Sequence, residues 1–216
     1  DAVDEHTRLV FIANQNNPTG TWMAGAELET LLKRIPPDVV VVVDEAYAEY
    51  IDTPDYPDCS RWLSAYSNLI VTHTFSKAYG LAGLRVGYAV ASPEITHLIN
   101  RVRQPFNVNS IALAAAEAAL KDEQHLSRSI ALNRAGLKQL GEGLRALGLF
   151  FIPSQGNFLC FQVTLPPRVV YEQLLRLGVI IRPVDNYGLA GFLRVSVGSP
   201  AENARFLESL AQVLSS

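Results

Sequence analysis

Three short polar stretches each follow an apolar run of the sequence, and they carry the residues best suited to chemistry. Residues 14–20 follow the run 9–13, Asp44 comes directly after five valines, and the stretch that contains Lys77 follows residues 69–71. In parallel α/β sheets, ligands bind beyond the carboxyl ends of the strands. We therefore expect the three stretches to converge on one crevice.

Asp44 and Lys77 supply opposite charges to this expected crevice. A carboxylate that directly follows an apolar strand loses hydration on burial unless it meets a cation. Lys77 follows Phe75 and Ser76 and precedes the small, glycine-rich stretch 78–83, so it can enter a crevice that backbone lines closely. Singly, Asp44 could be a helix cap and Lys77 a solvated surface lysine. Their order along the chain makes a binding site the more specific interpretation.

Two arginines in the second half of the chain are candidates for binding an anion. Arg194 interrupts the apolar run 192–197, and Arg182 follows the run 179–181. A lone arginine inside an apolar strand is costly to bury, so we expect Arg194 to meet an anion. Arg182 could instead be an exposed residue at the end of its strand.

The first half of the chain alternates apolar runs with helical periodicity. The predicted strands cover residues 9–13, 39–43, 69–71 and 86–90. The predicted helices cover residues 25–34 and 93–102. This alternation is typical of an α/β layer with a mostly parallel sheet.

The second half has a different pattern, which predicts a smaller α+β domain. Leucines recur at helical spacing from about residue 126 to 147, and Pro166-Pro167 and Pro200 each open a further helix. The predicted strands are 158–162, 179–181 and 192–197. We expect residues 1–120 to be part of a large domain and residues 121–216 to be the small one.

Composition excludes several classes of protein. The 216 residues include 18 Lys and Arg against 21 Asp and Glu, without a basic cluster, so a nucleic-acid partner is not expected. No apolar run approaches the roughly 20 residues of a membrane span, and the polar first residues lead us to expect no signal peptide. The two cysteines have no metal-ligand spacing, so no metal site is predicted. A cytoplasmic location is expected.

Three motifs in order, NNPTG, VVVDEAYAEY and TFSKAYGLAGLRVGY, resemble the core of the fold-type I aminotransferases that use pyridoxal 5′-phosphate. The later segments RQPFNVN, GNF, GVIIRP and FLRVSVG are similar to histidinol-phosphate aminotransferases. The resemblance covers essentially the whole chain. Family members carry a large portion ahead of NNPTG, so we expect this chain to contain only part of the large domain.

The resemblance implies roles for four residues around the cofactor ring. Lys77 would bond to the cofactor aldehyde and, once substrate displaces it, move a proton as base and acid. Asp44 would pair with the pyridine nitrogen, and burial beside that cation would favour the ionised carboxylate. Tyr47 and Asn17 would hydrogen-bond the phenolic oxygen of the ring.

The resemblance also implies two sites for anions. Ser76 and Arg85 would hold the cofactor phosphate, since arginine suits bidentate phosphate contacts. Arg194, together with Arg182, would bind the anionic group of the substrate.

The activity implied is the transfer of an amino group between histidinol phosphate and 2-oxoglutarate by a homodimer acting on small molecules. A lyase like threonine-phosphate decarboxylase is the nearest alternative, because it shares the cofactor motifs. A broad-range or aromatic aminotransferase and an inactive fragment of such an enzyme also stay open. If the N-terminal part is missing, we expect the 216-residue chain alone to bind cofactor weakly and to self-associate.

Overall fold

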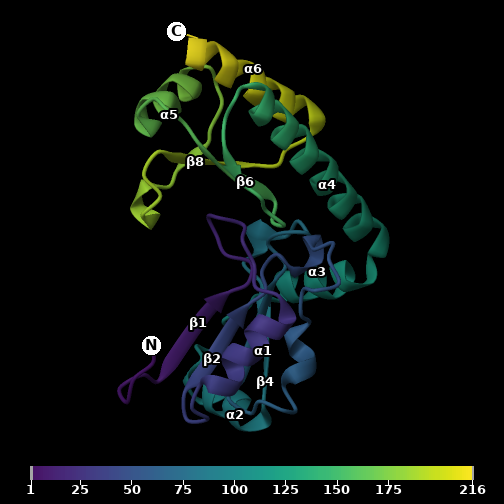
Figure 1. The fold of residues 1–216 in the computed structure, drawn as a ribbon. Coiled ribbons are helices and arrows are strands. Elements are labelled where there is room, and N and C mark those ends of the chain that lie inside the picture. Colours follow the sequence, from purple (N-terminus) through teal and green to yellow (C-terminus); the bar gives the residue numbers. More distant parts are fainter. Residues whose placement is uncertain (1, 216) are drawn as a thin grey trace. The chain divides into compact units, whose positions relative to one another are not determined.

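The computed structural model describes residues 2–215 and divides into two compact units. The N-terminal unit comprises the residues up to Gln15 together with Trp22–Ser127. The C-terminal unit comprises Asn16–Thr21 together with the residues from Arg128 onward. Figure 1 shows the elements of each unit, coloured along the chain.

The N-terminal unit is built on a four-stranded sheet in the order β1–β2–β3–β4. Its strands are β1 (Leu9–Ala13), β2 (Val40–Asp44), β3 (Leu69–Thr74) and β4 (Gly87–Ala91). The first three run parallel, and β4 is antiparallel to β3. Branched side chains fill β2 and the start of β3, and they favour extended backbone. The expected α/β class with a mostly parallel sheet is confirmed.

Helices cover part of this sheet. The helices of the unit are α1 (Gly25–Arg34), α2 (Pro93–Val102) and α3 (Ser110–Lys121), with the 3-10 turns η1 (Ala48–Tyr50), η2 (Cys59–Trp62) and η3 (Ala82–Leu84). Leu28 and Leu32 of α1 are buried against β2 and β3. The helix α3, which was not predicted, packs its alanines against Phe75 and Val86.

The two-residue alternation of β2 decides where the polar residues at its end point. Val41 and Val43 lie in the apolar cluster that includes α1. Glu45 continues their row, whereas Asp44 continues the row of Val42. Asp44 and Glu45 are neighbours in sequence but face opposite sides of the sheet.

The C-terminal unit is built on an antiparallel sheet in the order β5–β6–β8–β7. Its strands are β5 (Phe151–Ile152), β6 (Phe158–Gln162), β7 (Arg182–Pro183) and β8 (Phe192–Ser196). Its helices are α4 (Glu123–Ala146), α5 (Pro167–Arg176) and α6 (Pro200–Ser215), with the 3-10 turn η4 (Asp185–Tyr187). The long helix α4 begins in the N-terminal unit.

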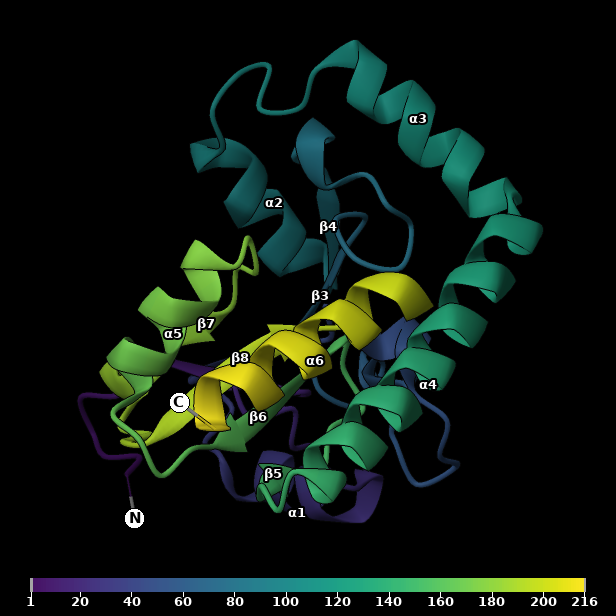
Figure 2. The ribbon, with the colours of Figure 1, turned by 90° about the horizontal axis from the view of Figure 1, so that it is seen from above.

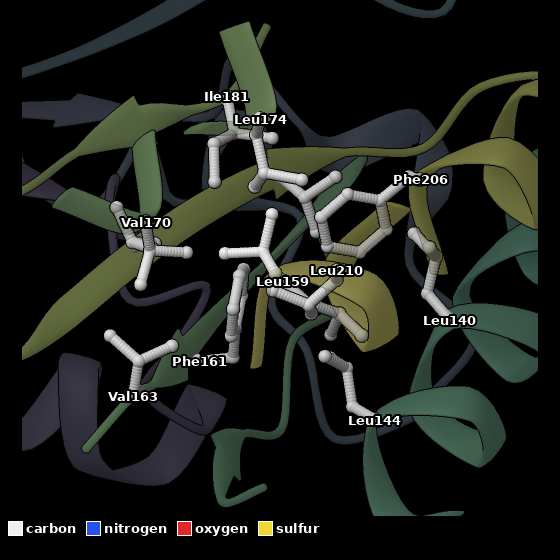
Figure 3. Close-up of a cluster of buried hydrophobic side chains, with 13 residues drawn as sticks. Leu140, Leu144, Leu159, Phe161, Val163, Val170, Leu174, Ile181, Phe206 and Leu210 are labelled. Carbon is white, nitrogen blue, oxygen red and sulfur yellow. The ribbon is translucent and has the colours of Figure 1, made fainter. Parts of the chain in front are cut away.

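One face of this antiparallel sheet carries the core of the C-terminal unit. Figure 2 shows α4, α5 and α6 over β6 and β8. In Figure 3, Leu140 and Leu144 of α4 and Leu210 of α6 point at the side chains of Leu159 and Phe161 of β6. Because these side chains are fully or almost fully buried, they hold β6 and β8 rigidly from one side.

The predicted strand 179–181 is wrong. The structure places β7 at Arg182–Pro183 instead. Gly178 has a positive φ of 75°, and the Val179 N–H donates to the Leu174 carbonyl at 2.9 Å, which closes the end of α5. The Val179 amide is therefore used by the helix cap and not by a strand ladder. The short strand β5 was not predicted.

No helix within residues 2–215 combines the length and the apolar character that crossing a membrane requires.

Candidate active site

Asp44 is the last residue of β2, and its side chain is exposed. The expectation that Asp44 itself is buried is therefore wrong for this structure; the buried carboxyl is that of Glu45, which is 2% exposed. The reason is the alternation of β2, which turns Glu45 toward the core. Asp44 accepts a hydrogen bond from the Ala46 N–H at 3.1 Å, and its exposed carboxylate is open to a cationic partner.

Lys77 lies three residues after the end of β3 and is half-buried. Its Nζ lies 5.1 Å from the centroid of the Tyr47 ring, and Tyr47 is only 5% exposed. The Lys77 carbonyl accepts from the Gly80 N–H at 2.9 Å, and the positive φ of Gly80, 73°, completes this turn. The structure thus brings Lys77 and Tyr47 together, with the amine on an aromatic face and not in an ion pair with any described carboxylate.

Ser76 and Arg85 also lie together. Arg85 Nη1 donates to Ser76 Oγ at 3.3 Å and to the Ala82 carbonyl at 2.9 Å. Arg85 follows η3 with a positive φ of 54°, which returns its side chain toward the turn that carries Ser76. A guanidinium and a hydroxyl in contact are a suitable donor set for a phosphate.

The C-terminal unit holds the second group of predicted site residues. Arg194 Nη1 donates to Asn17 Oδ1, and the Arg194 guanidinium lies 5.2 Å from the centroid of the Phe158 ring. Asn17 belongs to the segment Asn16–Thr21, which is part of the C-terminal unit. Arg194 Nε is buried and has no hydrogen-bond partner among the described residues. Arg194 is therefore held in place, but the described residues of its own chain leave its Nε without a hydrogen-bond acceptor.

Arg182 lies directly opposite Arg194 in the β7–β8 pairing. Side chains that are paired in this way lie on the same face of a sheet, and like charges there repel each other. No described carboxylate forms an ion pair with either arginine. Arg182 Nη2 donates to the Tyr187 hydroxyl at 3.4 Å, a contact that the sequence did not indicate. An anion between the two guanidiniums would remove the repulsion.

Sequence reasoning missed the pair Glu45 and His73. His73 Nε2 lies 3.5 Å from Glu45 Oε2. Burial raises the pKa of Glu45 to about 6, and burial lowers the pKa of His73. The signal was present in the row Val41, Val43, Glu45, because strand alternation places the third member inside.

Within residues 2–215, no group of three or more His, Cys, Asp or Glu side chains is arranged to hold a metal ion.

Comparison with known proteins identifies the family. A family model described as aminotransferase class I and II matches residues 1–210. The chain belongs to this family. This aminotransferase chain is 57% identical over 213 residues to histidinol-phosphate aminotransferase 2 of Pseudomonas fluorescens, a match that covers 99% of the chain and 58% of the relative. The chain thus spans less than two thirds of the length of that relative.

Solved structures agree with the family. The histidinol-phosphate aminotransferase of Sinorhizobium meliloti, solved in complex with pyridoxal-5′-phosphate, has a TM-score of 0.89 and 30% identity; the match covers 96% of this chain and 57% of that one. L-threonine-O-3-phosphate decarboxylase of Porphyromonas gingivalis has a TM-score of 0.86 and 25% identity; the match covers 100% of this chain and 67% of that one.

Proposed function

We propose that the whole protein uses pyridoxal 5′-phosphate to exchange an amino group between histidinol phosphate and 2-oxoglutarate. The observation that carries the proposal is the facing pair Arg182 and Arg194, with which no described carboxylate forms an ion pair, inside a chain of the aminotransferase family. The names of the similar curated relatives support histidinol phosphate as the phosphorylated substrate.

The donor set of the N-terminal unit fits the cofactor. When bound, pyridoxal 5′-phosphate supplies an aldehyde carbon that an amine can attack and a pyridine ring that accepts electrons. Ser76 and Arg85, which contact each other as described above, would hold its phosphate. The exposed Asp44 carboxylate would pair with the pyridine nitrogen and favour its protonated form.

Lys77 moves the proton of the reaction. Its Nζ would hold the cofactor at the aldehyde carbon until the amine of the substrate takes its place. The freed amine of Lys77 would then act as the base and acid that moves the proton of the reacting carbon. The Tyr47 ring under Nζ limits the positions that the amine can reach. By the sequence resemblance, Tyr47 would donate to the phenolic oxygen of the ring, and Asn17 is a further candidate donor.

The arginine pair binds the anionic end of each substrate. Arg194 is held by Asn17 and Phe158, so its unpartnered Nε is presented in a fixed direction. A guanidinium fork matches phosphate and carboxylate alike. The same pair can therefore accept the phosphate of histidinol phosphate in one half-reaction and a carboxylate of 2-oxoglutarate in the other.

The nearest second function is a lyase that acts on a phosphorylated amino acid. The structural similarity to L-threonine-O-3-phosphate decarboxylase supports this second function, because such an enzyme also needs a phosphate site. The whole protein is assayed with histidinol phosphate, O-phosphothreonine and an aromatic amino acid, and both glutamate formation from 2-oxoglutarate and release of carbon dioxide are measured.

We expect 2-oxoglutarate-dependent glutamate formation with histidinol phosphate, without release of carbon dioxide. Carbon dioxide from O-phosphothreonine would establish the lyase, and faster transfer from the aromatic amino acid would establish a broad-range aminotransferase. We further propose that the active protein is a cytoplasmic homodimer, which sedimentation of the whole protein tests.

A further inference from the structure

Three side chains from neighbouring strands meet beneath the end of the N-terminal sheet. Glu45 follows β2, His73 belongs to β3 and Tyr88 belongs to β4. The β3–β4 register pairs His73 with Tyr88, so both lie on one face of the sheet. This is the face that carries Val43 and Glu45 on β2. We call Glu45, His73 and Tyr88 the strand-end cluster.

Glu45 is the centre of the strand-end cluster. Its Oε1 accepts from the Cys59 N–H at 3.2 Å, which ties it to the start of η2. Its Oε2 lies 3.5 Å from His73 Nε2. The Glu45 N–H donates to the Thr72 carbonyl at 2.9 Å. The backbone hydrogen bonding between β2 and β3 therefore continues as far as Glu45. A carboxylate buried to this degree needs such donors.

His73 contacts both Glu45 and a residue of β4. Its ring stacks on the Tyr88 ring with centroids 5.0 Å apart and planes at 21°. His73 Nδ1 is buried without a hydrogen-bond partner among the described residues. Burial lowers the pKa of His73 and so favours the neutral imidazole, whose Nε2 is the ring nitrogen that faces Glu45.

We propose that the strand-end cluster positions the three strand ends that bind the cofactor. Glu45 directly follows Asp44, His73 precedes Lys77 by four residues, and Tyr88 follows Arg85 by three. None of the three cluster residues is proposed to touch cofactor or substrate. They act through the backbone that carries the residues that do, so the inference rests on the proposed function.

Removing one link should loosen this arrangement measurably. An unpaired polar group in the cluster would draw the strand ends apart to reach water, because burial without a partner is costly. A displacement of about 1 Å in a site can cost on the order of a hundredfold in function. We therefore expect cofactor affinity to fall about tenfold or more when the link between Glu45 and His73 is lost.

Acidic groups outside the cluster also act on Glu45 and His73, and this affects how the result of the test is interpreted. The charges of Asp58 and Glu49 act on Glu45, and those of Asp58 and Asp44 act on His73. The variants are therefore chosen to change one link while leaving these groups in place.

The test compares two variants that keep the size of the side chain. Glu45→Gln keeps an acceptor for Cys59 but removes the charge that pairs with His73, and His73→Phe keeps the stack on Tyr88 but removes the donor. The matched control is Glu117→Gln, which removes an exposed carboxylate on α3 that pairs with Lys121 at 2.7 Å.

Three properties of the whole protein are measured: the dissociation constant of pyridoxal 5′-phosphate, the pH midpoint of its visible absorbance when bound, and the fraction of Lys77 that carries cofactor after borohydride treatment. Circular dichroism shows whether each variant is folded. We expect a raised dissociation constant and a displaced midpoint in Glu45→Gln and His73→Phe. Their double variant should lose less affinity than the sum of the two, since one link is broken in each. Glu117→Gln should match the unmodified protein.

Each contrary outcome has one meaning. Unmodified protein that carries no cofactor on Lys77 after borohydride treatment overturns the proposed function, and this inference with it. Normal cofactor affinity and an unchanged midpoint in both folded variants overturn the positioning role alone. Loss of the fold in both variants also overturns it, in favour of a purely structural role.

Discussion

Asp44 and Glu45 show how much one position matters in a strand. Both are acidic and adjacent, yet one is exposed at the proposed cofactor site and the other is buried among core residues. Their chemistry differs accordingly, since the exposed carboxylate can reach a ligand, whereas burial raises the pKa of Glu45.

Replacing Asp44 by Asn tests its proposed pairing with the pyridine nitrogen. The amide cannot stabilise a proton there, so we expect turnover to fall on the order of a thousandfold, about 4 kcal/mol in barrier. Cofactor affinity should change much less, because Ser76 and Arg85 still hold the phosphate. Single-turnover rates and cofactor titrations of the whole protein measure the two effects. Unchanged turnover at saturating cofactor would show that Asp44 only caps the turn at Ala46.

Replacing Arg194 by Ala tests the anion site. We expect the Michaelis constant for histidinol phosphate to rise strongly and that for unphosphorylated histidinol weakly, because only the former presents a phosphate to the half-buried guanidinium. Steady-state kinetics with both substrates checks this. Arg168→Ala is the control, since Arg168 is an exposed arginine that pairs with Glu172 on α5. Equal effects on both substrates would show that Arg194 is structural.

The raised pKa of Glu45 predicts a pH dependence of stability. In the folded protein Glu45 titrates at about 6 and in the unfolded chain near 4.5, so the folded state binds the proton more tightly. The contribution is therefore favourable at low pH and is lost as pH rises from about 4.5 to about 6. The lowered pKa of His73 acts in the opposite direction.

The comparison with Glu45→Gln isolates the carboxyl. Relative to that variant, the free energy of unfolding of the unmodified protein should fall by about 2 kcal/mol across the window, at about 1.4 kcal/mol for each pKa unit. Urea unfolding at several pH values measures the difference. A difference that is constant with pH would mean that the Glu45 pKa is not raised.

At the scale of elements, the stability of the C-terminal unit depends on the packing of its helices against its sheet. Leu210 of α6 is fully buried in this core. We expect Leu210→Ala to lower the free energy of unfolding by about 2–5 kcal/mol, because a cavity adds to the lost transfer energy. Gln212→Ala on the exposed side of α6 is the control. Denaturant unfolding of both variants is the measurement, and equal stability would show that α6 is not part of the cooperative core.

Elements that follow from a local sequence pattern were predicted correctly. Elements that depend on contacts with other segments were not. The helices α1, α2, α5 and α6 follow from apolar periodicity and from prolines that open three of them. The helix α3 is rich in alanine and has little periodicity to reveal it. The run 179–181 has strand propensity, but the cap of α5 uses the Val179 amide. The strand β7 is only two residues long, since its pairing with β8 and not its own sequence defines it.

At the scale of the molecule, the edge strand β1 of the N-terminal sheet exposes apolar residues. Leu9 and Phe11 on the edge strand β1 are 54% and 73% exposed. We expect the 216-residue chain by itself to self-associate through this edge, as apolar edge strands do, and Phe11→Lys to reduce the association. Sedimentation over a range of concentrations tests this. A monodisperse monomer would show that the edge is already protected.

The domain boundary near residue 120 stays a prediction.

The sequence by itself determined the family, the α/β class and the identity of the candidate site residues, because motif order and local periodicity are properties of neighbouring residues. Only the tertiary structure decided which of these residues meet. Asn17 and Arg194 are 177 positions apart, and Arg182 faces Arg194 through strand register. The Glu45–His73 link likewise joins two strands that are neighbours only in space. Such contacts depend on how strands pair and which face they bury, which no single segment encodes.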